Sequence, residues 1–583
     1  MPSETDKSIK NKLARGQAAS QLDVTEKHLA HILYGVSEDK KYTKFEIPKR
    51  SGGTRLIKAP IAALKNIQST LSEKLYAHIE AIEKKENKPF VSFAFRKSAS
   101  IIDNAKRHKN RRWVLNLDLQ DFFPSFNFGR VRGFFIKDKD FKYSEEIATI
   151  LAQIACHEGT LPQGGPCSPV ISELIARILD MRMLGLAKKY KLTYTRYADD
   201  ITFSTNQREF PAAIAQQHDS SAIWKIGKAL RQRITDSGFV INEAKTRMSF
   251  RNGRQMVTGL VVNKKVNIAD SYYRQARAMC YFLFQNGFYY YKNYAKGPSK
   301  LTRLNPLEGR LGHIYNVKEK VDRRVLRDKR DKPSAMRKLY RDFLFYKYFL
   351  AWNKPLIITE GKTDLIHLKE AVRHLPAFQP EFGKQEDGKF IHALSYFNYE
   401  GKIAHEVLRL YGGGTGNLKN ILFDYRDFLH DKSDKYKHKP MNFPVIIFLD
   451  NDSGLKKFAS TVEEVTKNIK AVPKVSFSID SEDNFYHIMD NLYVVKTPGK
   501  DSYIEKFYDE EIIKMKIDGK TFCPDNKNEK AEGTGGFDNK KHYGKTKFAK
   551  EVIQAQANKI DFSGFKPLLE RIGQVIQDYA KKT

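Results

Sequence analysis

Two adjacent carboxylates, Asp199 and Asp200, lie within the segment TRYADDITFS, residues 195–204. The β-branched and aromatic residues on both sides predict two strands, and the acidic pair falls at the turn between them. Like charges held side by side repel each other and lose solvation, and a divalent cation such as Mg²⁺, which prefers oxygen ligands, would relieve both effects. Asp-Asp is also common in surface turns, so this segment alone leaves a metal site and a solvated turn as alternatives.

A third carboxylate, Asp118, comes at the end of the apolar run WVLNLDLQDFF, residues 113–123. The run predicts a buried strand, and a charge at its end is unfavourable unless it is paired or binds a metal. Three carboxylates that hold two Mg²⁺ ions suit nucleotidyl transfer, in which the metals activate a hydroxyl and stabilise charge on the phosphate. Basic side chains of a predicted hairpin over residues 42–60, among them Lys49 and Arg55, could neutralise a triphosphate.

A second acidic set begins after residue 354. Glu360 and Asp364 follow one short apolar strand, and Asp450 and Asp452 follow another, and each pair precedes a predicted helix. Repeated units of strand, acidic turn and helix predict a parallel α/β sheet, whose carboxyl edge collects ligands. Solvated acids in two ordinary turns are the alternative.

The composition favours a nucleic acid as partner. The chain has 583 residues, enough for two to four domains, and its 102 Lys+Arg against 68 Asp+Glu give a net charge of +34. No apolar run reaches the roughly 18 residues of a membrane-spanning helix, and the first residues hold no apolar signal core. The four cysteines show no paired spacing, so we expect free thiols and a cytoplasmic protein without a zinc module.

Periodicity and turn residues predict the remaining elements. Helices are expected over residues 1–40 and 61–86, the turn LPQGGP leads into another helix, and residues 238–250 read as strand, turn and strand. Residues 268–350 are predicted to be helical, basic and rich in tyrosine, which suits stacking on bases, although a helical bundle with a solvated basic face has the same pattern. A polar surface loop is expected over residues 522–546.

The order of the segments LDLQDFFPSF, LPQGGPCSP, YADD and GFVINEAKT resembles motifs A to D of reverse transcriptases, over about residues 20–320. The segment NAKRH, residues 104–108, resembles the NAxxH signature of retron reverse transcriptases, and VTG, residues 257–259, resembles their VTG signature. Group II intron and diversity-generating enzymes would lack this pair. The resemblance implies an α+β right-hand polymerase, with fingers and palm over residues 1–265 and a basic, RNA-binding thumb over residues 266–350.

The resemblance also implies roles by position. Asp118, Asp199 and Asp200 would be catalytic metal ligands, and Phe123 would exclude ribonucleotides by a clash with their 2′-hydroxyl. Lys49, Arg55, Asp121 and Gln163 would contact the incoming nucleotide, and Lys245 would donate a proton to pyrophosphate. The signature residues implied to bind RNA are Asn104, His108, Val257, Thr258 and Gly259.

A retron enzyme is implied to copy its own structured non-coding RNA (msr-msd) from dNTPs, primed from the 2′-hydroxyl of a guanosine. The product is a branched RNA–DNA hybrid, msDNA, and host RNase H would trim the template. A homo-oligomer is compatible with this activity.

Residues 351–583 resemble an α/β Toprim domain, which is Rossmann-like, with EGKTD and DND as its acidic motifs. The tail resembles that of nucleases of the overcoming-lysogenization-defect type. The implied Mg²⁺ ligands, two ions per active site, are Glu360, Asp364, Asp450 and Asp452, with Glu505 as a further ligand. Such a domain would cleave phosphodiesters as an effector in antiphage defence by abortive infection. The alternative is a catalytically silent module that binds nucleic acid and packages msDNA.

Overall fold

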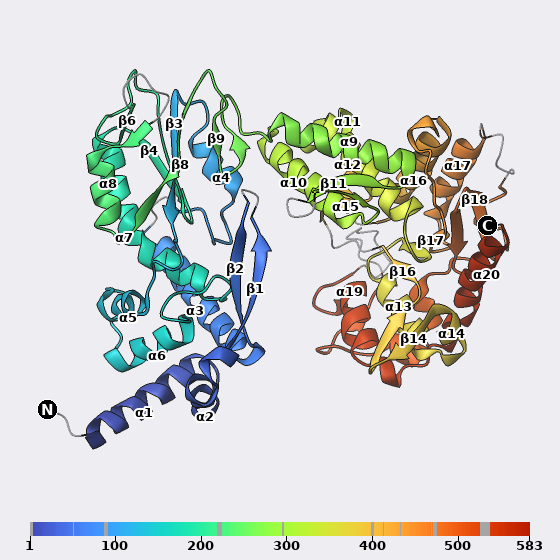
Figure 1. The fold of residues 1–583 in the computed structure, drawn as a ribbon. Helices are drawn as coiled ribbons and strands as arrows, with labels where there is room; N and C mark the ends of the chain where they lie inside the picture. The colour runs from blue at the N-terminus through green and yellow to red at the C-terminus, as the bar shows by residue number, and fades with distance from the viewer. Residues whose placement is uncertain are drawn as a thin grey trace. The chain divides into compact units, whose positions relative to one another are not determined.

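The computed structural model describes residues 4–49, 52–86, 91–217, 224–293, 297–397, 402–411, 413–431, 433–467, 469, 475–524 and 537–582. Arg50 and Ser51 of the predicted hairpin turn, and residues 525–536 of the predicted surface loop, lie outside this description. The chain forms two compact units (Figure 1). The N-terminal unit comprises Met1–Tyr273, Lys292–Ser299 and Asn316–Arg323, and the C-terminal unit comprises Arg274–Tyr291, Lys300–Tyr315 and Arg324–Thr583.

The N-terminal unit is built on a four-stranded antiparallel sheet. Its order is β4 (Thr193–Tyr197), β5 (Asp200–Thr205), β3 (Trp113–Gln120) and β8 (Val240–Phe250). β3 is buried over most of its length because it pairs with strands on both sides, as its apolar sequence predicts. Helices α7 (Ser168–Lys189) and α4 (Ile101–Arg107) both contact β4, and Figure 1 shows α4 and α8 (Lys228–Thr235) on opposite sides of the sheet.

The predicted hairpin and long helix are confirmed. β1 (Tyr42–Pro48) pairs with β2 (Thr54–Pro60), and α3 (Ala62–Glu86) follows. The prediction of a helical start is also confirmed by α1 (Glu4–Gln21) and α2 (Glu26–Ala30). The other helices of this unit are α5 (Phe128–Lys137) and α6 (Glu145–Ala155), and its short strand pairs are β6 (Ala215–Gln217) with β7 (Trp224–Ile226) and β9 (Met256–Val257) with β10 (Leu260–Val261).

The prediction of strand, turn and strand over residues 238–250 is wrong. A single strand, β8, runs along β3, with Asn242 opposite Asp118 and Arg247 opposite Asn116. Residues 243–246 therefore bulge out of the ladder. The polar residues that read as a turn are those of the bulge.

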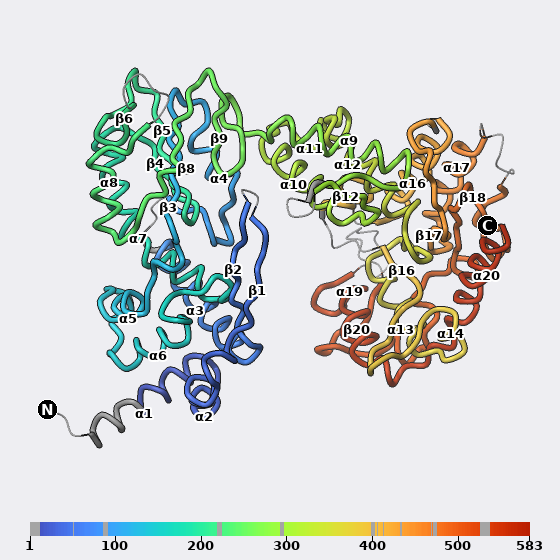
Figure 2. Tube along the Cα trace, in the orientation of Figure 1, coloured from blue at the N-terminus to red at the C-terminus, as the bar shows by residue number. Residues whose placement is uncertain are grey.

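The C-terminal unit contains a five-stranded sheet of order β16 (Ser395–Tyr396), β13 (Leu356–Thr359), β17 (Val445–Leu449), β19 (Leu492–Lys496) and β18 (Tyr486–Met489). All neighbours are parallel except β18 with β19. The predicted parallel sheet is thus confirmed. Helices α16 (Thr415–Tyr425) and α17 (Leu455–Thr466) pack together, α13 (Asp364–His374) packs against the π-helix Phe548–Gln554, and α20 (Lys566–Lys582) returns to β19 (Figure 2).

Residues 268–350 are mostly helical, as predicted, in α9 (Asp270–Asn286), α10 (Asn305–Val321), α11 (Leu326–Asp331) and α12 (Ala335–Phe345). The prediction is wrong at β11 (Tyr289–Asn293) and β12 (Gly297–Leu301), where the aromatic run favours a strand. Phe345 of α12 packs on Tyr425 and Phe428, at ring distances of 5.2 and 4.8 Å, inside the C-terminal unit. A separate thumb over residues 266–350 stays a prediction.

The remaining short elements of the C-terminal unit are α14 (Gln379–Phe382), β14 (Gly383–Glu386), β15 (Lys389–His392), α15 (Lys402–Val407), α18 (Glu510–Ile513), β20 (Thr521–Phe522), β21 (His542–Tyr543) and α19 (Lys545–Lys547). None of the described helices has both the length and the apolar character needed to cross a membrane.

Candidate active sites

The three carboxylates of the N-terminal unit meet at one end of its sheet. Asp118 of β3 lies directly opposite Asp200 of β5 in the antiparallel register, and Asp199 occupies the turn between β4 and β5. The backbone of this turn is fixed from β3, because the Leu119 amide donates a hydrogen bond to the Asp199 carbonyl at 3.0 Å. The arrangement matches the expected convergence of these residues.

Burial and repulsion between neighbouring carboxylates raise the pKa values of Asp199 and Asp200. Asp200 keeps an exposed edge, yet desolvation and the neighbouring Asp199 and Asp118 carboxylates raise its pKa to about 6. Desolvation first and Asp118 second raise the pKa of Asp199. Asp118 is buried, and both of its oxygens accept hydrogen bonds at 2.9 Å from Lys245 Nζ, which reaches it from the bulge of β8. The hydrogen bond to Asp118 in turn raises the pKa of Lys245.

The donor chemistry of these carboxylates fits a hard divalent cation, since such an ion would offset the repulsion that, after desolvation, helps to raise the pKa values of Asp199 and Asp200. As the side chains stand, no group of three or more His, Cys, Asp or Glu residues within the described ranges is arranged to hold a metal ion. The Lys245 ammonium is the cation that pairs with Asp118 here. The assignment of metal ligands stays a prediction.

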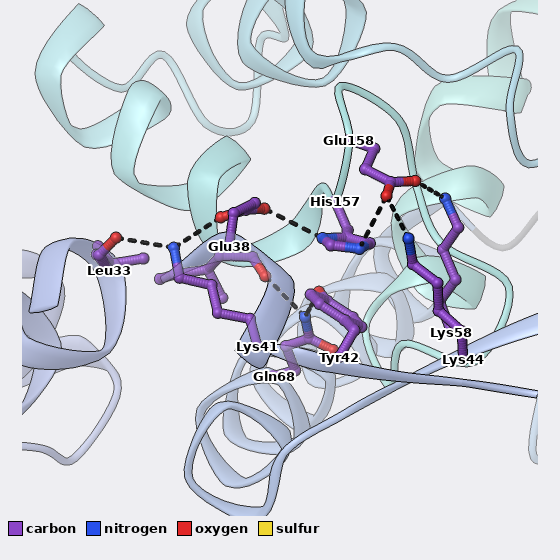
Figure 3. Close-up of polar contacts among 10 residues, drawn as sticks. Leu33, Glu38, Lys41, Tyr42, Lys44, Lys58, Gln68, His157 and Glu158 are labelled. Carbon is purple, nitrogen blue, oxygen red and sulfur yellow. Dashed lines mark hydrogen bonds and ion pairs between the residues drawn. The ribbon is translucent and has the colours of Figure 1, made fainter. Parts of the chain in front are cut away.

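Ion pairs anchor the base of the β1–β2 hairpin (Figure 3). Glu158, which follows α6, accepts hydrogen bonds from Lys44 of β1 at 2.6 Å and from Lys58 of β2. The neighbouring His157 ring stacks on Tyr42 with ring centres 4.0 Å apart, and its Nδ1 lies 3.1 Å from Glu38. These contacts fix the hairpin to the connection between α6 and α7.

The residues predicted to contact a nucleotide lie around this hairpin and the carboxylates. The Gln163 carbonyl accepts a hydrogen bond from the Lys58 amide at 2.8 Å, and the positive charge of Arg55 offsets a small part of the rise in the pKa of Asp199. Phe123 is half-buried against Phe95, with ring centres 6.1 Å apart. Lys49 and Asp121 are exposed. Their nucleotide contacts stay predictions.

The retron signatures lie largely inside the fold. His108 is fully buried, with Nε2 2.7 Å from the Thr195 hydroxyl and Nδ1 2.7 Å from the Ser204 hydroxyl. The Thr195 hydroxyl also donates to Asn104, at 2.5 Å. Burial lowers the pKa of His108 to about 3, so its ring is neutral. The network ties α4 to both strands of the hairpin that carries Asp199 and Asp200.

The second signature packs against the first. Val257 is fully buried, the Thr258 hydroxyl donates to the Ile101 carbonyl at 3.3 Å, and α4 contacts both β9 and β10. Gly259 has a positive φ of 81°, in the tight turn between these strands. Direct RNA contacts by the side chains of Asn104, His108 and Val257 are not supported, because these side chains are enclosed by protein; contacts by Thr258 and Gly259 stay predictions.

A second acidic group, also as expected, lies at the carboxyl edge of the parallel sheet. Glu360 follows β13 directly, and Asp450 follows the adjacent parallel strand β17. Asp364 accepts a hydrogen bond from the Gly361 amide at 2.7 Å, and Asp452 accepts one from Gly454 at 2.8 Å. Burial raises the pKa of Asp364 to about 7, and burial together with Asp364 raises that of Asp450 to about 8.

Lys545, which the sequence interpretation did not assign, is the basic residue of this group. Its Nζ lies 3.1 Å from Glu505 Oε2; burial lowers its pKa, but Glu505, followed by Asp450 and Asp364, outweighs this effect and raises the pKa. Glu505 is 1% exposed, and its Oε1 and the Oε2 of Glu360 have no hydrogen-bond partner. Orphaned carboxylate oxygens beside acids of raised pKa fit a divalent cation. Lys545 falls in the tail stretch KHYGKTKFAKEV, so the Toprim-nuclease resemblance was the signal that could have found it.

Comparisons with known proteins identify the family to which the chain belongs. The family model described as "Reverse transcriptase (RNA-dependent DNA polymerase)" matches residues 47–268. The chain is 31% identical over 291 residues to the retron Ec86 reverse transcriptase of Escherichia coli, a match that covers 49% of this chain and 80% of that one. The chain therefore belongs to the retron reverse transcriptase family.

A further relative is the retron Mx65 reverse transcriptase of Myxococcus xanthus, 34% identical over 256 residues. That match covers 41% of this chain and 55% of the relative, so the chain spans about half of its length. Among solved structures, a telomerase from Candida tropicalis in complex with an RNA fragment matches at 14% identity and a TM-score of 0.30, over 69% of this chain and 64% of that one. So low a score carries no argument about the fold.

Proposed function

We propose that the N-terminal unit is the catalytic part of an RNA-directed DNA polymerase that copies a cognate structured RNA. The observation that carries the proposal is the register of β3 and β5, which sets Asp118 opposite Asp200 with Asp199 in the adjoining turn. Membership in the retron reverse transcriptase family supports it. In this reaction two divalent ions, Mg²⁺ in our proposal, held by Asp118, Asp199 and Asp200, would supply nucleophile activation and charge stabilisation.

The protein side chains orient the reactants and handle the proton. Arg55 and Lys49 would hold the triphosphate by charge-assisted hydrogen bonds, with Asp121 and Gln163 beside the nucleotide. Phe123 would exclude a 2′-hydroxyl by its bulk. Lys245 is protonated at neutral pH, as an ordinary lysine is, and it would donate that proton to the leaving pyrophosphate.

Primer extension on an RNA template tests this function. Asp199→Asn is expected to abolish DNA synthesis, while Asp140→Asn, on an exposed loop, is expected to leave it unchanged. If both variants synthesise DNA equally well, the Asp199 carboxylate is not required for catalysis and the proposal is wrong.

For the retron product, we propose priming from a guanosine 2′-hydroxyl in the msr-msd RNA, to give branched msDNA. Purifying the protein from cells that carry its genomic neighbourhood and sequencing the bound nucleic acid checks this. DNA joined to a guanosine through a 2′,5′ linkage is expected, and a linear product with a free 5′ end would contradict it.

For the C-terminal unit, we propose a Toprim-type nuclease. Five acids (Glu360, Asp364, Asp450, Asp452 and Glu505) and Lys545 at the carboxyl edge of a parallel sheet support a metal-dependent phosphodiester-cleaving site. Glu360→Gln is expected to abolish cleavage of DNA or RNA and to leave msDNA unchanged. If phage defence survives this change, the unit is instead a silent module that packages msDNA; loss of defence supports a nuclease effector.

A further inference from the structure

Arg196, in β4 just before the catalytic turn, has a completely buried side chain. A guanidinium has five N–H donors, and all five have acceptors here. Nε and Nη2 donate to the two oxygens of Asp180, each at 2.8 Å. Nη1 and Nη2 donate to Glu173 at 2.7 and 3.1 Å, and Nη1 also donates to the Ala198 carbonyl at 3.2 Å.

The two acids that hold Arg196 belong to α7, about two helical turns apart on one face. They are fixed in turn, since the Tyr194 hydroxyl donates to Asp180 at 2.7 Å and the Ser92 hydroxyl donates to Glu173. A buried charge network of this kind has one favourable geometry, because any displaced member leaves an unpaired charge in the interior. The position of the guanidinium is therefore set by α7.

Ala198, the fifth acceptor, has a φ of +56°, a conformation that a residue with a Cβ atom adopts at a cost. Its carbonyl is held by Arg196, and the next carbonyl, that of Asp199, is held by the Leu119 amide at 3.0 Å. The turn is thus held at two points: Arg196 attaches it to α7, and the Leu119 amide attaches it to β3 beside Asp118. The directions of the two carboxylates in the turn follow from these two attachments.

We infer that Arg196 is a positioning residue of the polymerase site, which holds Ala198 in its left-handed conformation and so aims Asp199 and Asp200 toward Asp118. This inference rests on the proposed polymerase function. Lysine has three donors and no planar fork, so it keeps the charge at this position without satisfying the five acceptor contacts.

Single-turnover extension of a primed RNA template, over a range of dNTP concentrations that reaches saturation, measures both the maximal rate and the KM for dNTP. Arg196→Lys is expected to lower the rate about a hundredfold, the loss that a displacement of roughly 1 Å causes, with the KM for dNTP nearly unchanged. Adding Ala198→Gly is expected to restore part of that rate, because glycine adopts a positive φ without the arginine. Hydrogen exchange of residues 113–120, which include the Leu119 amide, is expected to be faster in Arg196→Lys than in the native protein.

Arg208→Lys, on an exposed bend, is the matched control and is expected to behave as the native protein. If neither the native protein nor Arg208→Lys extends a primer, the polymerase function itself fails. If they do, and Arg196→Lys has the native rate or its loss is not recovered at all by Ala198→Gly, the positioning role is overturned. Should Arg196→Lys not fold, Asp180→Asn takes its place, with a smaller rate loss and the same recovery expected.

Discussion

At the scale of single residues, burial and neighbouring carboxylates disfavour the ionised form of acids in both acidic centres. In the N-terminal unit the pKa of Asp200 is raised to about 6, and in the C-terminal unit those of Asp364 and Asp450 are raised to about 7 and 8. Desolvation is the largest cause in each case, and neighbouring carboxylates add to it. Carboxyl groups in such surroundings oppose folding when they are ionised.

The raised pKa values of the C-terminal unit predict a stability that falls as pH rises. Asp364 and Asp450 bind their protons more tightly in the folded state than an aspartate of the unfolded chain does, so their contribution to stability is complete below about pH 4 and is lost as pH rises through 7 to 8. Without divalent cations, the melting temperature is expected to fall between about pH 6 and 8 and to level off above pH 8, by roughly 2–4 °C for each kcal/mol lost. Calorimetry at several pH values measures it.

Asp450→Asn, which cannot ionise, is expected to melt above the native protein at pH 8 and to show a smaller fall. Asp387→Asn, in an exposed turn, is the matched control. Added Mg²⁺ is expected to reduce the fall in the native protein and to have little effect on Asp450→Asn. Equal pH profiles for all three proteins would contradict the prediction.

At the scale of elements, the sequence predicted most of what positions the sites. The apolar run before Asp118 and the alternation around Asp199 are local patterns, and the strands they predict are present. The bulge that brings Lys245 to Asp118 was not predictable, because a bulge is defined by the partner strand and not by its own residues. The burial of His108 and Arg196 was equally hidden, since polar residues are usually exposed and only their distant partners explain these two.

The ion pairs under the β1–β2 hairpin predict a kinetic effect. Glu158→Gln removes the charge that holds Lys44 and Lys58, which loosens the hairpin that presents Arg55. Partly exposed pairs are worth about 0–1 kcal/mol each, so the KM for dNTP is expected to rise by roughly two- to fivefold with kcat less affected. Glu145→Gln, which breaks the exposed pair with Arg132, is the control in the same steady-state assay. If Glu158→Gln keeps the native KM, the ion pairs of Glu158 with Lys44 and Lys58 do not contribute to nucleotide binding.

His108, which directly follows α4, and Lys106 of α4 predict opposite effects. His108→Ala leaves the buried Thr195 and Ser204 hydroxyls short of partners, so unfolding in urea is expected to show a loss of about 1–3 kcal/mol or more, with unchanged RNA affinity of the folded protein. Lys106→Ala, on the exposed side, is expected to keep the stability and to weaken RNA binding at low salt. A folded His108→Ala protein with weakened RNA binding would restore a direct role for the signature histidine.

At the scale of the whole molecule, the sequence predicted two sheets, each with an acidic group, but not the extent of the compact units. Charge and motif content change near residue 354, yet α12 and the π-helical turn Tyr346–Leu350 pack inside the C-terminal unit. The reason is that the buried side chains of Phe345 and Phe349 pack against aromatic residues from beyond residue 420. The change near residue 354 reflects which residue types and motifs follow one another in the sequence. The extent of a compact unit depends instead on contacts between residues that are distant in sequence.

This packing predicts how the chain tolerates truncation. A protein that ends at residue 350 exposes these aromatic side chains, and it is expected to aggregate on expression. A protein that ends at residue 273 keeps nearly all of the N-terminal unit and is expected to be more soluble. Soluble yield and light scattering of the two proteins make the comparison, and a monodisperse protein from residues 1–350 would show that the helices of this region hold together alone.

The Arg196 network has a consequence for building chimaeras from related enzymes. Its guanidinium, both of its acids and the turn that it holds fall within residues 168–205, so a crossover before α7 and another after β5 transfer the network nearly intact. A crossover between α7 and β4 would instead join an arginine from one parent to acids from another, and any mismatch would leave a charge in the interior. A chimaera should therefore take α7, β4 and β5 from the same parent enzyme.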